Sequence, residues 1–463
     1  MAKWYLKEFE WKNSPLDLYK KLHNSEHSFF LYTSLLHNES TRFSYMSCDP
    51  YIIFTAKRDQ IIINRQNQIE KLNGNPFVVF EDLLAQGTID YQFDINIFGK
   101  HFFRGGAVGY WGYDLKDHIE KLASIAQDEP HLPDAYWAFY DGLILIDHLR
   151  NKYYLIGTED CIRKLESKMQ SEDDPLDNTE QLEYNIMPSV IKDEYIKQIG
   201  IVKEYIANGD VYEVNLSQRF NLEIQSENLW NDFNIFKSLV KTSPSPFSAF
   251  IKLGEWSVIS SSPELFLKTR DRKAESKPIK GTRPRDSDFF EDEAMYLDLL
   301  NSEKDRAENV MIVDLVRNDL GRVSKTGSVE ATDLFAIEKY TTVFQMVSTI
   351  KSTIADRYTC IDAIKSCFPP GSMTGAPKIR AMQIIEEIEP FKRGVYSGSL
   401  GYIGYDGSVE LSVVIRTLIL RGNKGHFQTG GAIVWDSVAE AEYQECLDKA
   451  EGIIKALENL RAV

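Results

Sequence analysis

The sequence predicts an α+β protein built on antiparallel β-sheets. Short segments rich in β-branched and aromatic residues follow one another with turn residues between them, as at Tyr51–Ala56 and Gly142–Asp147. Stretches with helical periodicity are gathered in separate runs later in the chain. This order indicates hairpin-connected strands, because a parallel sheet would require strands and helices to alternate.

The elements are expected in the following order. Up to about residue 160 the chain consists mainly of strand-like segments. Beyond it we expect helices over Asp193–Ile206, Phe289–Val316, Tyr340–Ala355, Ala376–Glu387 and Val438–Leu457. We expect strands over Val211–Phe220, Gly398–Tyr405 and Ser412–Leu420.

The polar, acidic segment Ser171–Asn178 is the best candidate for a domain boundary. It is either a linker between two domains or an exposed loop within one. The linker interpretation divides the chain into a β-rich part, residues 1–170, and a second domain, residues 186–463.

Composition and charge restrict the class of partner. With 463 residues, 43% of them hydrophobic, the chain can bury a large core. Its net charge of -16 repels phosphate backbones and anionic lipids, so neither nucleic acid nor a membrane is expected as a partner. A small anionic substrate would need a local cationic pocket or a metal ion.

Cysteine usage and the start of the chain predict a cytoplasmic protein. The five cysteines are scattered, odd in number and without a CxxC pair, which is typical of reduced thiols. The first residues lack the apolar region of a signal peptide, and there is no apolar run long enough to span a membrane.

Two predicted helices carry acidic pairs at one-turn spacing. Asp305 and Glu308 form one pair, Glu442 and Glu445 form the other, and Lys449 follows Glu445 by one turn. Spacing alone favours solvated helix faces. If the two faces meet, however, Mg2+ with its preference for oxygen ligands would offset the repulsion of four carboxylates. Two of them would then bind the metal directly and two would lie behind.

Two further segments contain candidate catalytic groups. Lys280 lies between Ile279 and a Gly281–Thr282 turn, and partial desolvation there would lower its pKa and make the amine nucleophilic. The alternative is a basic surface loop. Glu264 lies among apolar residues, and burial would raise its pKa to a range suited to a general acid. The alternative is a solvated turn carboxylate.

Small-residue segments provide candidate anion sites. The glycine-rich segment Phe368–Lys378, which includes Ser372, leads into a predicted helix, where backbone N–H groups can hold an anion. Gly430, Gly431 and Ala432 form a second expected turn, and Arg416, on a predicted strand, could clamp a carboxylate. Taken alone, each of these is better explained as a structural turn or a surface arginine. No glutaminase triad is recognisable, so nitrogen, if it is transferred, must arrive as ammonia.

Six segments together resemble component I of the chorismate-utilising enzymes, the group that includes anthranilate, aminodeoxychorismate, isochorismate and salicylate synthases. They are GGAVGYWGYDL at 105–115, SSPELF at 261–266, PIKGTRPR at 278–285, AENVMIVDLVRNDLGRV at 307–323, FPPGSMTGAPKIRAM at 368–382 and GGAIVWDSVAEAEYQECLDKA at 430–450. The resemblance implies large antiparallel sheets packed as a sandwich with helices outside. It also implies that residues 186–463 form the chorismate-binding catalytic domain.

The resemblance implies roles for the candidate residues. Glu308 and Glu445 match direct Mg2+ ligands, Asp305 and Glu442 match outer-shell positions, and Glu264 matches the general acid that protonates the departing 4-hydroxyl. The implied substrate-binding set is Tyr396, Arg416, Ser372, Gly281, Thr282, Gly430, Gly431, Ala432 and Lys449.

Lys280 distinguishes between family members. Anthranilate synthases usually carry alanine there, whereas PIKGT resembles aminodeoxychorismate synthases, in which a lysine is thought to attack C2 of chorismate. The resemblance thus implies Mg2+-dependent amination of chorismate, on the route to 4-aminobenzoate and folate. Ammonia would come from a glutamine amidotransferase subunit (component II). The alternatives are anthranilate synthase component I and a catalytically inactive chorismate-binding subunit.

Three positions depart from the family pattern. Glu213 stands where aminating enzymes often have glutamine, and its role is unexplained. Gln345 replaces a histidine that relatives use in pyruvate elimination. Residues 31–34 replace the signature of tryptophan-inhibited relatives, which implies that tryptophan does not inhibit this protein.

Overall fold

The computed structural model describes residues 2–35, 41–66, 68–99, 102–171, 182–225, 231–340 and 343–460. Its α-helices are α1 (Pro15–His23), α2 (Pro76–Ala85), α3 (Glu159–Met169), α4 (Lys192–Ala207), α5 (Asp232–Thr242), α6 (Phe289–Asn301), α7 (Glu303–Gly321), α8 (Cys360–Cys367), α9 (Lys378–Ile388) and α10 (Ala439–Glu458). Short 3-10 helices occur at Ile95–Phe98, Tyr113–His118 and Gly371–Met373.

The described strands form two large sheets. The first has 13 strands: β12 (Tyr184–Pro188), β13 (Glu213–Ile224), β25 (Lys424–Ile433), β24 (Thr417–Arg421), β15 (Trp256–Ser262), β14 (Phe247–Leu253), β2 (His27–Tyr32), β3 (Phe43–Cys48), β10 (Gly142–Asp147), β11 (Lys152–Gly157), β1 (Ala2–Phe9) and β7 (Ile89–Tyr91), with β21 (Gly375–Ala376) beside β13. The second has 12: β18 (Ile279–Pro284), β20 (Val343–Thr353), β17 (Lys273–Lys277), β16 (Leu265–Arg270), β23 (Val409–Val413), β22 (Ser399–Gly404), β8 (Gly106–Trp111), β9 (Ala135–Phe139), β4 (Ile52–Lys57), β5 (Gln60–Arg65) and β6 (Gln68–Asn73), with β19 (Glu330–Lys339) beside β20. Apart from the parallel β1–β7 pair, neighbouring strands run antiparallel.

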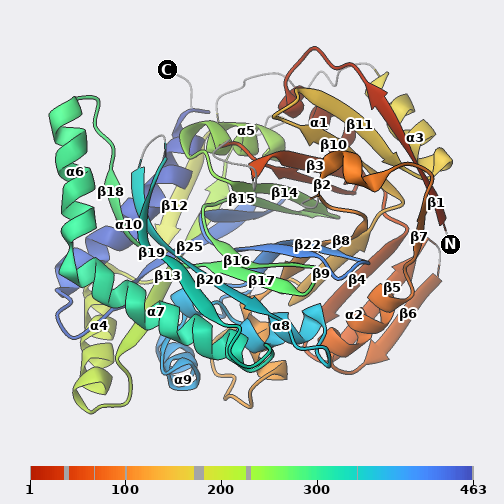
Figure 1. The fold of residues 1–463 in the computed structure, drawn as a ribbon. Helices are drawn as coiled ribbons and strands as arrows, with labels where there is room; N and C mark the ends of the chain where they lie inside the picture. The colour runs from red at the N-terminus through yellow and green to blue at the C-terminus, as the bar shows by residue number, and fades with distance from the viewer. Residues whose placement is uncertain are drawn as a thin grey trace.

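The two sheets pack face to face, and helices cover their outer faces (Figure 1). Alternation along a strand explains this, since successive side chains point to opposite faces. On β2, Phe29 enters the core between the sheets, where it joins Val108 of the second sheet. The next residue, Phe30, packs outward in the core that contains α1, α4, α5 and α10. The predicted α+β sandwich with antiparallel sheets and outer helices is therefore confirmed.

Most predicted elements are present, with three corrections. The helix expected over Phe289–Val316 is broken into α6 and α7, because Ser302 leaves the helical backbone conformation and caps α7 through its side chain. The helix expected over Tyr340–Ala355 is wrong: this segment contains strand β20, whose β-branched residues suit its central place among β17, β18 and β19. The strand expected over Ser412–Leu420 is split between β23 and β24, which belong to different sheets.

Both halves of the chain contribute to both sheets. Strand β14 pairs with β2 in the first sheet, and β22 pairs with β8 in the second. The proposed boundary between residues 1–170 and 186–463 stays a prediction, and residues 172–181 of the candidate linker lie outside the described residues.

Two smaller findings concern cysteines and membrane spans. All five cysteines are free thiols, as predicted. Among the helices that the structure describes, none combines the length and apolar character needed to cross a membrane.

Candidate active site

Lys280 lies in a buried ion pair. It is the second residue of β18, and its Nζ donates a hydrogen bond of 2.8 Å to Oε1 of Glu213, the first residue of β13. The Lys280 side chain is 9% exposed and that of Glu213 is fully buried. The two strands belong to different sheets, so the pair joins the sandwich layers at one end.

The charge state of Lys280 differs from the sequence prediction. Burial alone would lower its pKa, but the carboxylates of Glu213 and Glu308 outweigh burial and raise the pKa above its ordinary value. The predicted lowering of the pKa is therefore wrong for the ligand-free protein. Lys280 is an ammonium here and must lose a proton before it can act as a nucleophile.

Gly281 is part of an irregularity in β18 rather than a free turn. It has φ +86°, and the pairing of β18 with β20 shifts register between Ile279 and Thr282. A Cβ at position 281 would lie 2.9 Å from the carboxylate of Asp305 on α7. Glycine is thus required both by the backbone angle and by the close approach of α7. The bulge directs Lys280 toward Glu213.

Glu264 is buried next to the glycine-rich segment. Its Oε1 accepts a hydrogen bond of 2.6 Å from the hydroxyl of Ser372, whose carbonyl accepts one of 3.2 Å from the Asn215 amide. Burial raises the pKa of Glu264 to about 7, despite the opposite effects of Ser372 and Lys280. The expected rise of its pKa is confirmed. A general acid with this pKa is half protonated near neutral pH.

The two acidic helices lie close to one another around Lys304 and Lys280. Lys304 of α7 is 3.9 Å from Glu308, and its charge also acts on Glu442 and Glu445 of α10. Each carboxylate has a partner: Arg283 for Asp305, Lys304 for Glu308, Ser437 for Glu442 and Lys449 for Glu445.

These carboxylates offer oxygen ligands to a divalent cation. Within the described residues, no three His, Cys, Asp or Glu side chains lie close enough to hold a metal ion. Mg2+ commonly takes only one or two carboxylates together with waters and an anionic substrate group, so a two-carboxylate site meets its needs. Burial raises the pKa of Glu308, and the negative charge of Glu213 raises it further. Burial also raises the pKa of Glu442, so a cation would relieve both carboxylates. The oxygen-only donor set fits Mg2+.

Residues Gly430, Gly431 and Ala432 do not form the predicted turn. They belong to β25 and pair with Ser217, Leu216 and Asn215 of β13. Pairing with β24 extends only to Phe427, so this part of β25 turns its other edge to α10. There the Gly430 carbonyl accepts a hydrogen bond of 2.9 Å from Lys449. A Cβ on Gly431 would lie 3.3 Å from Glu442, so the strand runs against the acidic face of α10.

Arg416 and Tyr396 were both predicted to bind substrate. The strand predicted for Arg416 is wrong, because this residue lies between β23 and β24, with φ +49°. Its side chain is partly buried, burial lowers the pKa of its guanidinium, and the guanidinium donates a 3.4 Å hydrogen bond to Ser243. No carboxylate of the described residues pairs with it. Tyr396 is buried with its ring 5.8 Å from the Arg393 guanidinium.

Thr282 faces Gln345 across the β18–β20 pair. Gln345 therefore lies on a strand, not before a helix, and its Oε1 is buried with no hydrogen-bond partner in the described part of the chain. The ion pairing of Glu213 and the contact of Asn215 with Ser372 were not predicted. No local pattern could have found them, because β13 also carries Asn215, Ser217 and Gln218 and is not an apolar strand in which a single carboxylate stands out.

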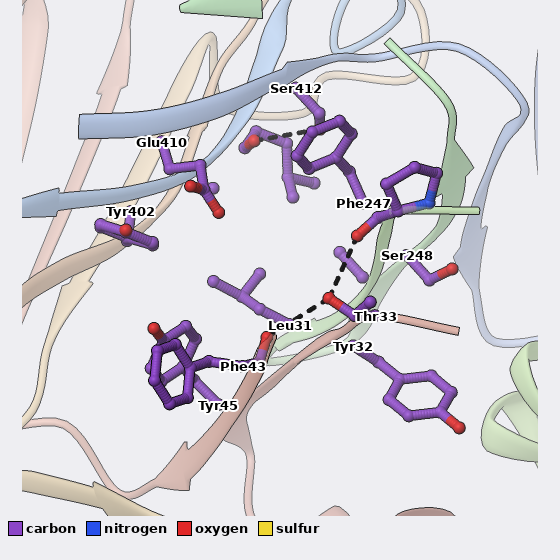
Figure 2. A pocket seen from close by; sticks show the side chains of 14 residues that line it. Leu31, Tyr32, Thr33, Phe43, Tyr45, Phe247, Ser248, Tyr402, Glu410 and Ser412 are labelled. Atoms are coloured by element: carbon purple, nitrogen blue, oxygen red, sulfur yellow. Dashed lines mark hydrogen bonds between the residues drawn. The ribbon is translucent and has the colours of Figure 1, made fainter. Parts of the chain in front are cut away.

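A cavity of about 40 Å³, separate from the candidate active site, lies between the sheets and away from Lys280. It is lined by Leu31, Tyr32 and Thr33, and Figure 2 shows Glu410 facing them from the second sheet. The Thr33 hydroxyl is 3.3 Å from the carbonyls of both Phe43 and Pro246. The cavity has room for a few water molecules.

Comparison with known proteins identifies the family. The model of the chorismate binding enzyme family matches residues 34–455. The chain belongs to this family. Over 467 residues it is 34% identical to anthranilate synthase component 1 of Acetivibrio thermocellus, which covers 96% of this chain and 93% of the relative. It is also 34% identical to aminodeoxychorismate synthase component 1 of Escherichia coli, over 97% of both chains.

A solved structure shows the same fold. Anthranilate synthase component I from Streptococcus pneumoniae superposes with a TM-score of 0.77 at 30% identity, over 90% of this chain and 93% of the relative. As a member of the chorismate binding enzyme family, the protein is an enzyme that acts on chorismate.

Proposed function

We propose that this protein aminates chorismate at C4 to give 4-amino-4-deoxychorismate, for 4-aminobenzoate and folate synthesis in the cytoplasm. The single observation that carries the proposal is a lysine, Lys280, buried among Glu213, Glu264 and Glu308. A buried amine facing a substrate site is suited to covalent catalysis. Ammonia would come from a glutamine amidotransferase subunit, in keeping with the name component 1 of the relatives.

Binding of chorismate, a dicarboxylate, would use the cationic groups of the site. Arg416, partly buried and without a carboxylate partner among the described residues, would hold one carboxylate in bidentate fashion. Tyr396, Thr282, Lys449 and the backbone of Ser372 and of Gly430–Ala432 would complete the substrate contacts. Glu308 and Glu445 would hold Mg2+, backed by Asp305 and Glu442. When bound, the ion would neutralise the second substrate carboxylate.

The chemistry would proceed in two displacements. The free amine of Lys280 forms a bond to C2 of chorismate, the double bond shifts, and the C4–O bond breaks. Glu264, protonated because of its raised pKa, donates a proton to the departing hydroxyl, which leaves as water. Ammonia then forms a bond to C4, the C2–N bond to Lys280 breaks, and the new ammonium returns a proton to Glu264.

Anthranilate synthase component 1 is the second candidate, because relatives with both names are equally similar to this chain. Both reactions consume chorismate and ammonia, but their products differ. Anthranilate forms directly and fluoresces. Aminodeoxychorismate yields 4-aminobenzoate only when a separate lyase is added.

The test is incubation of the purified protein with chorismate, Mg2+ and ammonium chloride, followed by chromatography with and without the lyase. We expect 4-aminobenzoate only in the lyase-supplemented sample and no anthranilate. Direct formation of anthranilate would contradict the proposal, and an inert protein would favour a chorismate-binding subunit without turnover.

Mass spectrometry tests the covalent step. Lys280→Ala should abolish a chorismate-derived adduct on the protein, whereas Lys273→Ala, at an exposed position of β17, should keep it. Normal amination by the Lys280→Ala variant would rule out the covalent route.

A further inference from the structure

Glu213 is anchored by backbone pairing at the start of β13. Strand β13 pairs with β25 from Val214 onward and with β21 on its other side, where Glu213 lies opposite Ala376. The N–H of the preceding Tyr212 donates to the Ala376 carbonyl at 2.7 Å. A Cβ at Gly375 would lie only 2.1 Å from the Glu213 carbonyl, so β13 and β21 approach too closely there for a side chain at position 375. The backbone of Glu213 is therefore held in place, and its carboxylate extends from a fixed position.

The ion pair is incomplete on the Glu213 side. Oε1 accepts the hydrogen bond from Lys280, while Oε2 is buried and has no hydrogen-bond partner among the residues that the structure describes. A buried carboxylate oxygen without a partner is costly, and a buried ion pair contributes little net stability compared with apolar residues of the same size. Stability alone does not account for this pair. Oε2 remains able to take up a proton.

Four carboxylates from different parts of the chain interact electrostatically with Lys280. Glu213 comes from β13, Glu264 precedes β16, Glu308 comes from α7 and Glu445 from α10. Among the carboxylates of the described residues, that of Glu213 alone accepts a hydrogen bond from the Lys280 amine. Glu264 is engaged by Ser372, and Glu445 by Lys449. Glu213 is therefore the group best placed to receive a proton from Lys280.

We propose that Glu213 is the general base for Lys280: it accepts the ammonium proton before the amine attacks chorismate and returns it after the lysine leaves. This inference rests on the proposed function, since it concerns the same covalent step. It also gives a role to the carboxylate of Glu213, which stands where aminating enzymes often have glutamine.

The proton balance closes over one turnover. The Lys280 ammonium transfers a proton to the Glu213 carboxylate, which leaves a neutral amine and a carboxylic acid. The amine forms the C2–N bond while Glu264 supplies the proton of the departing water. When ammonia displaces the lysine, the lysine leaves as a neutral amine and recovers its proton from Glu213. The site then regains its starting charge, and no proton from solvent is needed to activate the nucleophile.

This arrangement predicts a particular pH dependence. In the native protein the proton stays within the site, so the rate of adduct formation should be constant from about pH 5 to 6, where Glu264 with its pKa of about 7 stays protonated. In Glu213→Gln the proton must leave to solvent, so over the same range the rate should fall about tenfold for each pH unit of acidification. A purely structural role of Glu213 would instead lower the rate by one factor at every pH.

The experiment is rapid-quench mass spectrometry of the Lys280 adduct, with Mg2+ and chorismate saturating and ammonia omitted. A pH-independent rate for the native chain and a unit slope for Glu213→Gln support the inference. Parallel profiles, or an unchanged rate in the variant, overturn it while the covalent function stands. If the native chain forms no adduct, the covalent step of the proposed function fails, and this inference fails with it.

Two further variants make the test independent of folding. Glu213→Asp keeps a carboxylate and should retain the flat profile at a lower rate; a sloped profile for this variant overturns the inference even if Glu213→Gln does not fold. Asp147→Asn removes another fully buried carboxylate, paired with Arg42 in the first sheet, and serves as the control for loss of a buried charge. Its adduct rate should match the native profile.

Discussion

The hydroxyl of Ser372 donates a 2.6 Å hydrogen bond to Oε1 of Glu264 and so joins the glycine-rich segment to the candidate general acid. This bond favours the ionised carboxylate, whereas burial favours the neutral acid and dominates. The pKa of Glu264 is thus set by two opposed effects, of which one can be removed by mutation.

The pH dependence of amination should follow Glu264. Activity needs the protonated acid, so kcat should fall as the pH rises through about 7. In Ser372→Ala the pKa rises further, and the alkaline limb should move up by about one pH unit. Steady-state rates between pH 6 and 9 test this. If the alkaline limb of the pH profile does not move in this variant, Glu264 is not the proton donor.

Stability should also depend on Glu264. Its pKa is near 7 in the folded protein and at its ordinary value of 4.5 after unfolding. A group with a raised folded pKa stabilises below its unfolded pKa, and this contribution is lost as the pH rises through the folded pKa. Between these values the loss is roughly 3 kcal/mol. Urea denaturation of Glu264→Gln should therefore show growing stabilisation over the native chain from pH 5 to 8. Equal curves at pH 8 would contradict the raised pKa.

Replacement of Gly281 should cost more than the backbone angle alone. Gly254 has φ +65° and open space around its Cβ position, so Gly254→Ala measures the conformational cost, about 1–2 kcal/mol. Gly281→Ala adds a collision with Asp305 and should be less stable in urea denaturation than the Gly254 variant. It should also lose activity, because Lys280 is adjacent. Equal losses of stability in the two variants would mean that α7 moves away from the added Cβ at no energetic cost.

Replacement of Arg416 should raise the stability of the protein and weaken its binding of chorismate. Arg416→Met removes a partly buried guanidinium that has no carboxylate partner among the described residues, so the thermal midpoint should rise. The KM for chorismate should increase about tenfold or more, because a charge-assisted bidentate contact is lost. Arg421→Met is the control, since Arg421 pairs with Glu255 at the surface. An unchanged KM for Arg416→Met would exclude carboxylate binding.

The metal site should depend on Glu445 and not on its neighbours along α10. Glu445→Gln should weaken Mg2+ activation by about 10-fold or more. Glu451→Gln removes an exposed carboxylate of the same helix, paired with Lys455 at the same spacing, and should leave activation unchanged. Magnesium titrations of activity and isothermal titration calorimetry measure both. Equal Mg2+ dependence of the two variants would remove Glu445 from the ligand set.

Local pattern predicted helices better than central strands. Helices α4, α9 and α10 match the expected ranges, because an apolar stripe at helical spacing reflects one buried face. Strand β20 was mistaken for a helix, since its residues are buried on both faces, with α6 and α7 packed against it, and lose the alternation that marks a strand. The same limit applies to Gly430–Ala432, whose small residues serve close packing against β13 and α10 rather than a turn.

By itself the sequence determined the family, the α+β class and the motif residues of the site, because these are recorded in ordered local segments. The tertiary structure alone decided the charge state of Lys280. Its partner Glu213 is 67 residues away in the chain and reaches it from the other sheet. A pKa depends on burial and on charges brought together by folding, and neither can be read from the spacing of residues along the chain.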